Sequence, residues 1–319
     1  MVPARPLSTA GLLLAVLALA ACERAASPHP AADPAVLAAF QQAQAQWRAQ
    51  RLADLTKPDG WTSLIGLHWL DPGTHRVGSD ADNGIRLSMG PAHLGVFTVR
   101  GGQVSFVADA PVELDCKPAR GGGLRSDKDE GGPDLLVFDG GKGQASVIER
   151  GGRLALRVKH ADADSRVRFS GLDYWPGGPG WQVQARFVAY PAGKTLPIVN
   201  IIGVTEDVPN PGVLEFERDG KTYRLEALTD GADGLFLVFA DRTSGHGSYG
   251  AGRYIDAAAP DAQGRVLLDF NRAYNPPCAF TPFATCPLPP PENRLDLRVE
   301  AGERDYRKPK PAAHPEDRP

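Results

Sequence analysis

The spacing of apolar positions near the N-terminus predicts one helix. Five apolar residues recur close to the helical period of about 3.6 residues, namely Val36, Leu37, Phe40, Trp47 and Leu55. Asp33 suits the N-cap, and Pro34 suits the first helical position because the backbone N–H that proline lacks is unused there. The helix should stop at Lys57-Pro58-Asp59-Gly60. We therefore expect a helix over residues 34–56, about 35 Å long at about 1.5 Å per residue.

After Gly60 the pattern changes to the alternation that is typical of β-strands. Three pairs of alternating runs flank two-residue turns: 95–100 and 103–108 around Gly101-Gly102, 145–150 and 153–158 around Gly151-Gly152, and 213–218 and 221–228 around Asp219-Gly220. Such turns between such runs predict antiparallel hairpins. Residues 181–187 alternate as a strand with one wet face, and the apolar run 235–239 predicts a central strand covered on both faces.

These elements predict a mainly β fold of two packed antiparallel β units, sandwich- or barrel-like, preceded by one N-terminal α-helix. The turn-rich segment 174–180 marks a boundary between an N-terminal β unit over 61–172 and a C-terminal β unit over 181–304. One continuous sheet system is the alternative. The 36 glycines and 29 prolines suit many turns. Residues 305–319 are charged and proline-rich, which favours a disordered tail.

The first residues indicate where the protein resides. Arg5 precedes an apolar run over residues 11–19, which is too short to span a bilayer, since a span needs about 20 residues. Leu19-Ala20-Ala21-Cys22 then resembles a bacterial lipoprotein signal. This predicts a signal peptide over 1–21, lipidation of Cys22 by acyl chains such as palmitate, and a tether over 22–33. A plain secretory signal cut near Ala21 is the alternative. Glu23 after the cysteine favours the outer membrane, facing the periplasm.

Charge and composition exclude some partners. Removing residues 1–21 leaves 298 of 319 residues and takes away Arg5, so the formal charge changes from −3 to −4. An acidic chain without a basic run does not predict binding to nucleic acid or to an anionic membrane surface. Hydrophobic content of 42% and mean hydropathy of −0.27 are those of a soluble globular body. The predicted contact with the membrane is the lipid on Cys22.

The cysteines agree with export. Of four cysteines, lipidation of Cys22 leaves Cys116, Cys278 and Cys286. The periplasm is oxidising, so the close pair Cys278 and Cys286 is expected to form a disulfide. Two reduced thiols are one alternative. A zinc site is the other, and it needs two further ligands, of which His246 is the nearest candidate; the spacing of the cysteines exceeds that of common zinc motifs. We expect Cys116 to be a small buried residue rather than a free thiol.

A proline-dense loop after a predicted strand carries the most specific pattern. It reads DFNRAYNPPCAFTPFATCPLPPPENRL over 269–295. With DRTSGHGSYGAGRYI over 241–255 and AGE over 301–303, it resembles the bacterial family named domain of unknown function 1684. The resemblance extends from about Trp47 to Glu303. It implies a fold and a polar site, and no established activity.

The polar residues of these motifs are the candidate site. We expect ligand binding by Tyr249, Arg253, Asp269, Asn271, Arg272 and Asn293. Arg253 is the anion anchor, and catalytic candidates are Asp241, Asp269 and Tyr249. The competing interpretation is a buried polar network that holds irregular loops. The leading functional prediction is binding of a small polar or anionic envelope ligand. A hydrolase with Asp269 or Asp241 as general base and a structural lipoprotein without ligand are the alternatives.

Other chemistry lacks support in the sequence. Residues 245–250 satisfy G-x-G-x-x-G, but no helix pattern follows that could direct an N-terminus at a pyrophosphate. No G-x-S-x-G or H-E-x-x-H pattern occurs, and Ser244 and Ser248 are too close to His246 in sequence for triad geometry. We expect no metal and no cofactor, and whether the protein is an enzyme stays open.

Overall fold

The structure, a computed structural model, describes Met1 and residues 33–229 and 234–307. The predicted signal peptide, the lipidation site Cys22, nearly all of the tether and residues 308–319 of the predicted tail lie outside the described residues. Among the described residues no helix is both long and apolar enough to cross a membrane.

Helix α1 spans Pro34–Thr56, as the sequence predicts, and the Asp33 side chain accepts a hydrogen bond from the Ala35 N–H at 2.9 Å. The face that docks differs from the predicted apolar stripe. Val36 is 60% exposed, whereas Gln44 is 5% exposed. Polar residues therefore make much of this contact, and their partners come from the other end of the chain.

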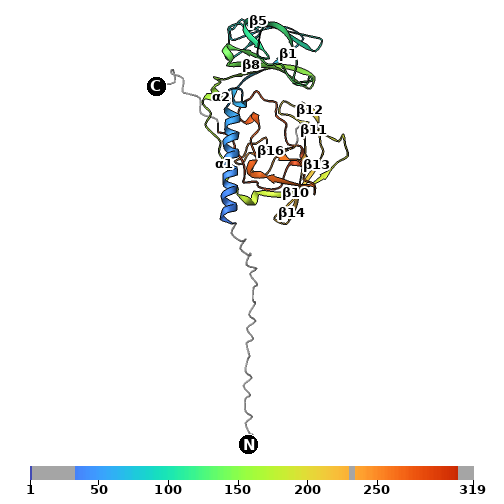
Figure 1. The fold of residues 1–319 in the computed structure, drawn as a ribbon. Helices are drawn as coiled ribbons and strands as arrows, with labels where there is room; N and C mark the ends of the chain where they lie inside the picture. The colour runs from blue at the N-terminus through green and yellow to red at the C-terminus, as the bar shows by residue number, and fades with distance from the viewer. Residues whose placement is uncertain (2–32, 230–233, 308–319) are drawn as a thin grey trace.

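A nine-stranded sheet forms the N-terminal part of the body (Figure 1). Its main path runs β1-β9-β8-β7-β5-β4-β2-β3, with β6 paired to β5. All its pairings are antiparallel except that of β2 with β3. The sheet curls around a core that includes Phe97, Leu136 and Leu156. The strands are β1 Leu64–Leu70, β2 Gly73–Gly78, β3 Ile85–Arg86, β4 Gly95–Arg100, β5 Gln103–Leu114, β6 Lys117–Leu124, β7 Leu136–Phe138, β8 Gly143–Arg150 and β9 Arg153–His160.

The three predicted hairpins are present as β4–β5, β8–β9 and β13–β14. Both residues of each turn have positive φ, which glycine adopts freely, as at Gly151 (56°) and Gly152 (74°). A fourth tight turn, Asp115-Cys116, joins β5 to β6. The expected burial of Cys116 is wrong: the turn projects its side chain away from the core, and it is an exposed free cysteine.

Smaller sheets form the C-terminal part around a second core that includes Leu214, Leu237 and Phe270. One sheet has the order β14-β13-β10-β17, and the pairs β11–β12 and β15–β16 stand beside it. β15 is covered on both faces as predicted, but it pairs as a strand with β16 alone. The strands are β10 Gln182–Ala189, β11 Thr195–Val199, β12 Thr205–Pro209, β13 Gly212–Arg218, β14 Lys221–Ala227, β15 Gly234–Phe239, β16 Arg253–Ala258 and β17 Arg265–Asp269.

Helix α1 runs along the C-terminal sheets and reaches the nine-stranded sheet at its C-terminal end (Figure 1). There Arg166 of the short helix α2 donates to Thr56 O at 2.8 Å, and Lys159 of β9 donates to Asp59 O at 2.6 Å. The mainly β, antiparallel fold behind one N-terminal helix is therefore confirmed. The remaining helical turns are α2 Asp164–Val167, η1 Trp61–Ser63, η2 Asp139–Gly141, η3 Pro179–Trp181, η4 Phe270–Arg272, η5 Pro277–Ala279 and η6 Pro291–Asn293.

Candidate functional site

Arg253, the first residue of β16, forms a fully buried ion pair with Asp241. Arg253 NH2 lies 3.2 Å from Asp241 Oδ1, and both side chains are 0% exposed. Burial lowers the pKa of Arg253, and Asp241 opposes that shift. The guanidinium also donates to Thr243 Oγ1 and to the backbone carbonyls of Val299, Ala301 and Glu303. This arginine is thus surrounded by protein acceptors.

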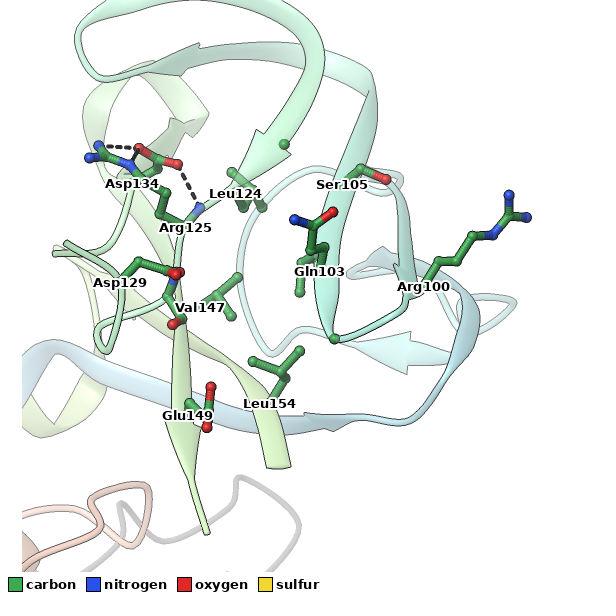
Figure 2. A pocket seen from close by; sticks show the side chains of 14 residues that line it. Arg100, Gln103, Ser105, Leu124, Arg125, Asp129, Asp134, Val147, Glu149 and Leu154 are labelled. Atoms are coloured by element: carbon green, nitrogen blue, oxygen red, sulfur yellow. Dashed lines mark hydrogen bonds and ion pairs between the residues drawn. The ribbon is translucent and has the colours of Figure 1, made fainter. Parts of the chain in front are cut away.

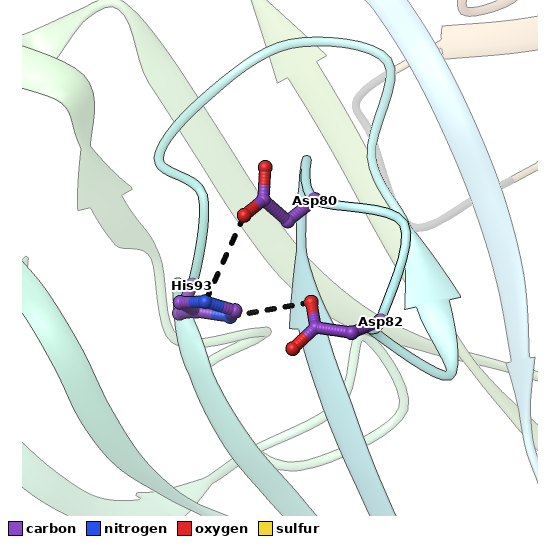
Figure 3. A group of neighbouring side chains, drawn as sticks. All are labelled: Asp80, Asp82 and His93. Atoms are coloured by element: carbon purple, nitrogen blue, oxygen red, sulfur yellow. Dashed lines mark ion pairs between the residues drawn. The ribbon is translucent and has the colours of Figure 1, made fainter.

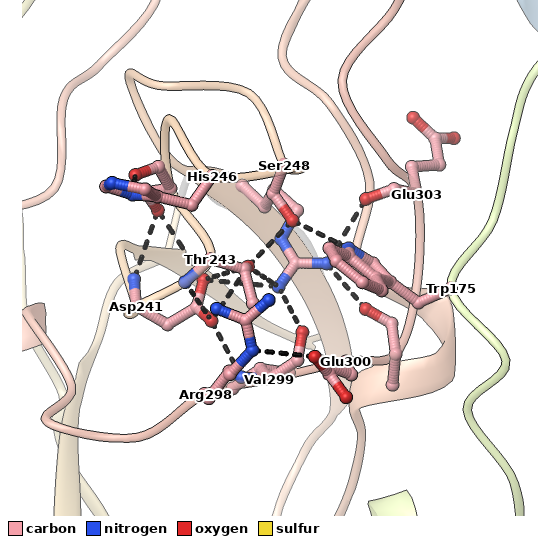
Figure 4. Close-up of polar contacts among 12 residues, drawn as sticks. Trp175, Asp241, Thr243, His246, Ser248, Arg298, Val299, Glu300 and Glu303 are labelled. Atoms are coloured by element: carbon pink, nitrogen blue, oxygen red, sulfur yellow. Dashed lines mark hydrogen bonds and ion pairs between the residues drawn. The ribbon is translucent and has the colours of Figure 1, made fainter.

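The Asp241 carboxylate likewise has protein partners, which donate hydrogen bonds to both of its oxygens (Figure 4). It accepts hydrogen bonds from Thr243 N at 3.1 Å, from Thr243 Oγ1 at 2.9 Å and from Val299 N at 2.7 Å. Thr243 Oγ1 in turn lies 2.7 Å from Ser248 Oγ, which accepts from Trp175 Nε1 at 2.9 Å. A general base needs a lone pair directed at its substrate. The arrangement favours the structural interpretation of the motif.

Asp269 joins α1 to the end of β17. Its Oδ2 accepts from Gln44 Nε2 at 2.8 Å and from Gln182 Nε2 at 3.0 Å, and Arg272 Nε lies 3.4 Å away. Its Oδ1 accepts from the backbone and side-chain N–H groups of Asn271 at 3.0 and 2.8 Å. This carboxylate, 8% exposed, therefore holds η4 and α1 in place rather than facing an open site.

Glu303 makes the second attachment of α1. Arg51 Nε donates to Glu303 Oε1 at 2.9 Å, and Asn275 N donates to Oε2 at 2.7 Å. Arg51 NH2 also donates to Asn275 O at 2.8 Å. Because the Glu303 side chain is 0% exposed, this pair resists solvent screening. Asp269, at the start of the proline-dense loop, and Glu303, in the AGE motif after it, thus both bind the N-terminal helix.

The remaining candidates lie apart from these groups. Asn293 Oδ1 accepts from Glu226 N at 2.6 Å, and its Nδ2 donates to Val238 O at 2.9 Å, so it connects β14 to β15. Tyr249 packs with Leu55 and Phe280, and burial followed by the charge of Asp305 raises its pKa. The structure brings Asp269, Asn271 and Arg272 together and pairs Asp241 with Arg253. It does not gather all the candidates at one cavity.

The predicted disulfide between Cys278 and Cys286 is present, with Cα atoms 6.2 Å apart. Both sulfurs are used in the bridge, which leaves no thiolate for the zinc alternative. His246, its third proposed ligand, is exposed and places Nδ1 3.1 Å from Ser244 O.

One group of side chains in the described part of the chain has spacing suited to a cation. Asp80, Asp82 and His93 lie on the loops beside β2 and β3 (Figure 3). The imidazole nitrogens lie 3.9 Å from Asp80 and 3.8 Å from Asp82. The two aspartates are 62% and 69% exposed, so they are largely hydrated, and no further observation among the described residues indicates a cation there.

Four of the cavities among the described residues bear on the site, and none of these four is lined by Tyr249, Arg253 or Asp269. One of them, about 660 Å³, is an open groove within the N-terminal sheet (Figure 2). Two of its polar lining residues are paired with each other, since Arg125 Nε donates to Asp134 Oδ1 at 2.8 Å. None of the residues that line this groove has a buried polar side-chain atom without a partner among the described residues.

A second cavity, about 270 Å³, lies between the N-terminal sheet and the C-terminal sheets. Its apolar side chains are Ile198, Val208, Leu228 and Phe236. Two ion pairs line it: Lys128 Nζ lies 3.1 Å from Glu206 Oε1, and Arg150 NH1 lies 2.7 Å from Asp127 Oδ2. The other lining residues are Asn200, Thr229, Thr285 and Pro287. An apolar surface with a few convergent polar groups is typical of small-molecule sites.

Asn200, in the wall of this cavity, has a buried donor without a partner among the described residues. Its Oδ1 accepts from Ile202 N at 3.1 Å and from Val204 N at 3.0 Å, which fixes the orientation of the amide. Its Nδ2 has no partner among the described residues, and the side chain is 5% exposed. A buried donor without a partner carries a free-energy penalty that a ligand acceptor can remove. No other lining residue of the four cavities has such an atom among the described residues.

Sequence reasoning missed this cavity. Its polar residues come from the 125–129 loop, from the end of β8, from the turn after β11, from β12 and from the segment after β14. No local motif joins these segments, since they meet only when the two groups of sheets pack. The proline-dense loop gave one signal, because Thr285 beside the disulfide lines the cavity and accepts from Arg150 Nε at 3.2 Å.

Comparisons with known proteins agree with the motif. The model of the DUF1684 family, described as a protein of unknown function, matches residues 167–304. Among solved structures, the chain is similar to the solution NMR structure of an uncharacterized protein of Haloarcula marismortui. The identity is 34%, over 44% of this chain and 78% of that chain, with a TM-score of 0.37. A search of the curated proteins finds no match. Through this segment, the chain belongs to the DUF1684 family.

Proposed function

We propose that the protein is an exported lipoprotein, anchored through Cys22 to the outer membrane and facing the periplasm, that binds a small polar or anionic ligand. The site is the cavity between the two groups of sheets. The observation that carries the proposal is Asn200, a residue of the cavity wall whose buried Nδ2 lacks a partner among the described residues. The volume of about 270 Å³ suits a ligand smaller than a typical drug.

The alternatives receive less support. Hydrolysis through Asp241 or Asp269 is disfavoured because both carboxylates are already saturated by protein donors. A purely structural lipoprotein leaves the paired charges, the apolar surface and the free amide of one cavity without a common explanation.

Ligand-dependent melting tests the binding proposal. The purified protein is screened with amino acids, monosaccharides, short carboxylates and phosphate esters at millimolar concentration. A ligand at about 100 times its Kd should stabilise the fold by about 2.7 kcal/mol. Val208→Phe fills the cavity and should abolish the shift. Val199→Phe is the matched control, since Val199 is 43% exposed on the neighbouring strand. The proposal fails if no compound raises the melting temperature, or if the shift persists in Val208→Phe.

Anchoring has its own test. Cys22→Ser removes the lipidated side chain, so the protein should move from the membrane fraction to the soluble periplasmic fraction. Mass spectrometry of the wild-type N-terminus should show an acylated Cys22. An unchanged membrane partition of the variant, or a mature N-terminus elsewhere, contradicts this part of the proposal.

A further inference from the structure

The N-terminal sheet turns a row of cations toward the cavity. Paired residues of an antiparallel ladder share a face, and residues two apart along a strand share it as well. Ser146 pairs with Arg157, and Arg150 pairs with Arg153, so the three arginines lie on one face of β8 and β9. The opposite face of β9 carries Leu154, Leu156 and Val158, which pack in the core. The arginines therefore lie on the outer face, where Arg150 lines the cavity.

Arg157 has no acidic partner on that face. Its Nε is buried without a hydrogen-bond partner, and no ion pair of its guanidinium occurs within the described ranges. Burial, followed by the charge of Arg150, lowers its pKa to about 10, while Asp127 opposes the shift. Arg150 and Asp127 both line the cavity, so the residues whose charges act on Arg157 belong to the cavity wall. A half-buried charge that lacks a counterion is unfavourable until an anion joins it.

Position agrees with the electrostatics. The Arg157 guanidinium lies 5.6 Å from the centre of the Trp61 ring. Trp61 packs against the apolar cluster that includes Ile198 and Leu228, the same side chains that form the apolar wall of the cavity. Arg157 therefore lies on the same face of the sheet as Arg150, which lines the cavity, and next to Trp61, which packs against the cluster that contributes to the cavity wall.

The charge balance then indicates the class of ligand. Lys128 is offset by Glu206 and Arg150 by Asp127, whereas Arg157 and Lys159, which both lie beside the Trp61 ring, form no ion pair among the described residues. We propose that the ligand is an amphipathic anion, with a carboxylate or phosphate head on the side of the cavity nearest Arg157 and a short apolar part against Ile198, Leu228 and Phe236. This inference rests on the proposed function, because it assigns a chemical class to the same cavity.

A matched series of six-carbon probes tests the class of ligand. Isothermal titration of the protein compares hexanoate, hexyl phosphate, hexanamide and hexylamine. At least one anion should bind at least tenfold more tightly than the amide, and hexylamine should bind most weakly. The stronger of the two anions identifies the head group. Val208→Phe should abolish binding of every probe, which places the binding in this cavity.

Variants of the arginines assign the charge preference. Arg157→Gln should reduce the advantage of the anion over the amide to less than threefold and should leave the melting temperature unchanged or raised, since it removes an unpaired charge. Arg157→Lys keeps the charge and should retain part of the preference. Arg153→Gln is the control, because Arg153 shares the strand and face but lies over the Trp69 ring at 4.3 Å.

The outcomes separate the two proposals. Equal binding of hexanoate and hexanamide, both lost in Val208→Phe, overturns the anionic class and keeps the binding function. A preference that survives Arg157→Gln also overturns the inference, as does a lowered melting temperature in that variant, which would assign Arg157 to the fold. If the amide, the amine and both anions all fail to bind at millimolar concentration, the anionic class falls; if the wider screen also finds nothing, the binding function falls with it.

Discussion

Replacing Arg253 with lysine is expected to destabilise the fold strongly. Lysine keeps the positive charge but has three N–H donors on one nitrogen, whereas the arginine side chain makes five hydrogen bonds to protein acceptors. At least two buried acceptors must then lose their donor. Each unpaired buried group costs about 1–3 kcal/mol, so Arg253→Lys should lower the free energy of unfolding by about 2–6 kcal/mol.

Urea unfolding followed by tryptophan fluorescence measures this loss. For a body of this size, each kcal/mol corresponds to about 2–4 °C in Tm, so the variant should melt roughly 5–20 °C below the wild type. Arg242→Lys is the control. The Arg242 side chain is 64% exposed and pairs with Asp296 at the surface, so its replacement should change stability by less than about 0.5 kcal/mol.

The slope of the unfolding free energy with urea should be the same in all three proteins, because it reports the surface exposed on unfolding. If Arg253→Lys unfolds at the wild-type midpoint, the structural account of Arg253 is refuted. If it also loses affinity for the ligand, Arg253 serves the ligand instead of the fold.

Two further predictions concern the disulfide and a buried tyrosine. Cys278→Ser combined with Cys286→Ser should lower the free energy of unfolding by about 2–3 kcal/mol, the value expected for a bridge that closes a short loop. Cys116→Ser, which changes an exposed free cysteine, should leave the stability unchanged. Free thiols at 278 and 286 in mass spectrometry of the unreduced protein would contradict the predicted bridge. Burial, followed by the charge of Glu303, raises the pKa of Tyr174, so the neutral ring contributes stability that is lost as pH rises above about 10, where the unfolded chain ionises. The Tyr174 hydroxyl has no partner among the described residues, so Tyr174→Phe should have the stability of the wild type at pH 7.5 in urea unfolding. At pH 10.5 the variant should lose less stability than the wild type. An equal loss in both proteins would show that Tyr174 is not the group responsible.

Local patterns predicted the elements of this fold well. Glycine turns between alternating runs identified three hairpins, because a two-residue turn with positive φ leaves the chain few other conformations. The cap at Asp33 and the proline at position 34 located the start of α1 to the residue. These features depend on neighbours in sequence, so a single sequence contains them.

Long-range polar contacts could not be predicted in the same way. The docking face of α1 depends on Gln44 and Arg51, which bind Asp269 and Glu303 more than 200 residues away. An amphipathic pattern describes apolar burial and gives no signal for buried polar side chains. The inter-sheet cavity could not be predicted for the same reason, since lining residues such as Asn200 and Arg150 come together only through tertiary packing.

The attachment of α1 limits how the chain can be divided. A fragment comprising residues 167–304, the segment that matches the family, would contain Asp269 and Glu303 without Gln44 and Arg51. Two carboxylates shaped for burial would then face water or an unfilled groove, and the aromatic side chains beneath the helix, such as Phe280, would be uncovered. We therefore expect the segment that matches the family model to be less stable without α1, which supplies the partners of these carboxylates from outside the matched range.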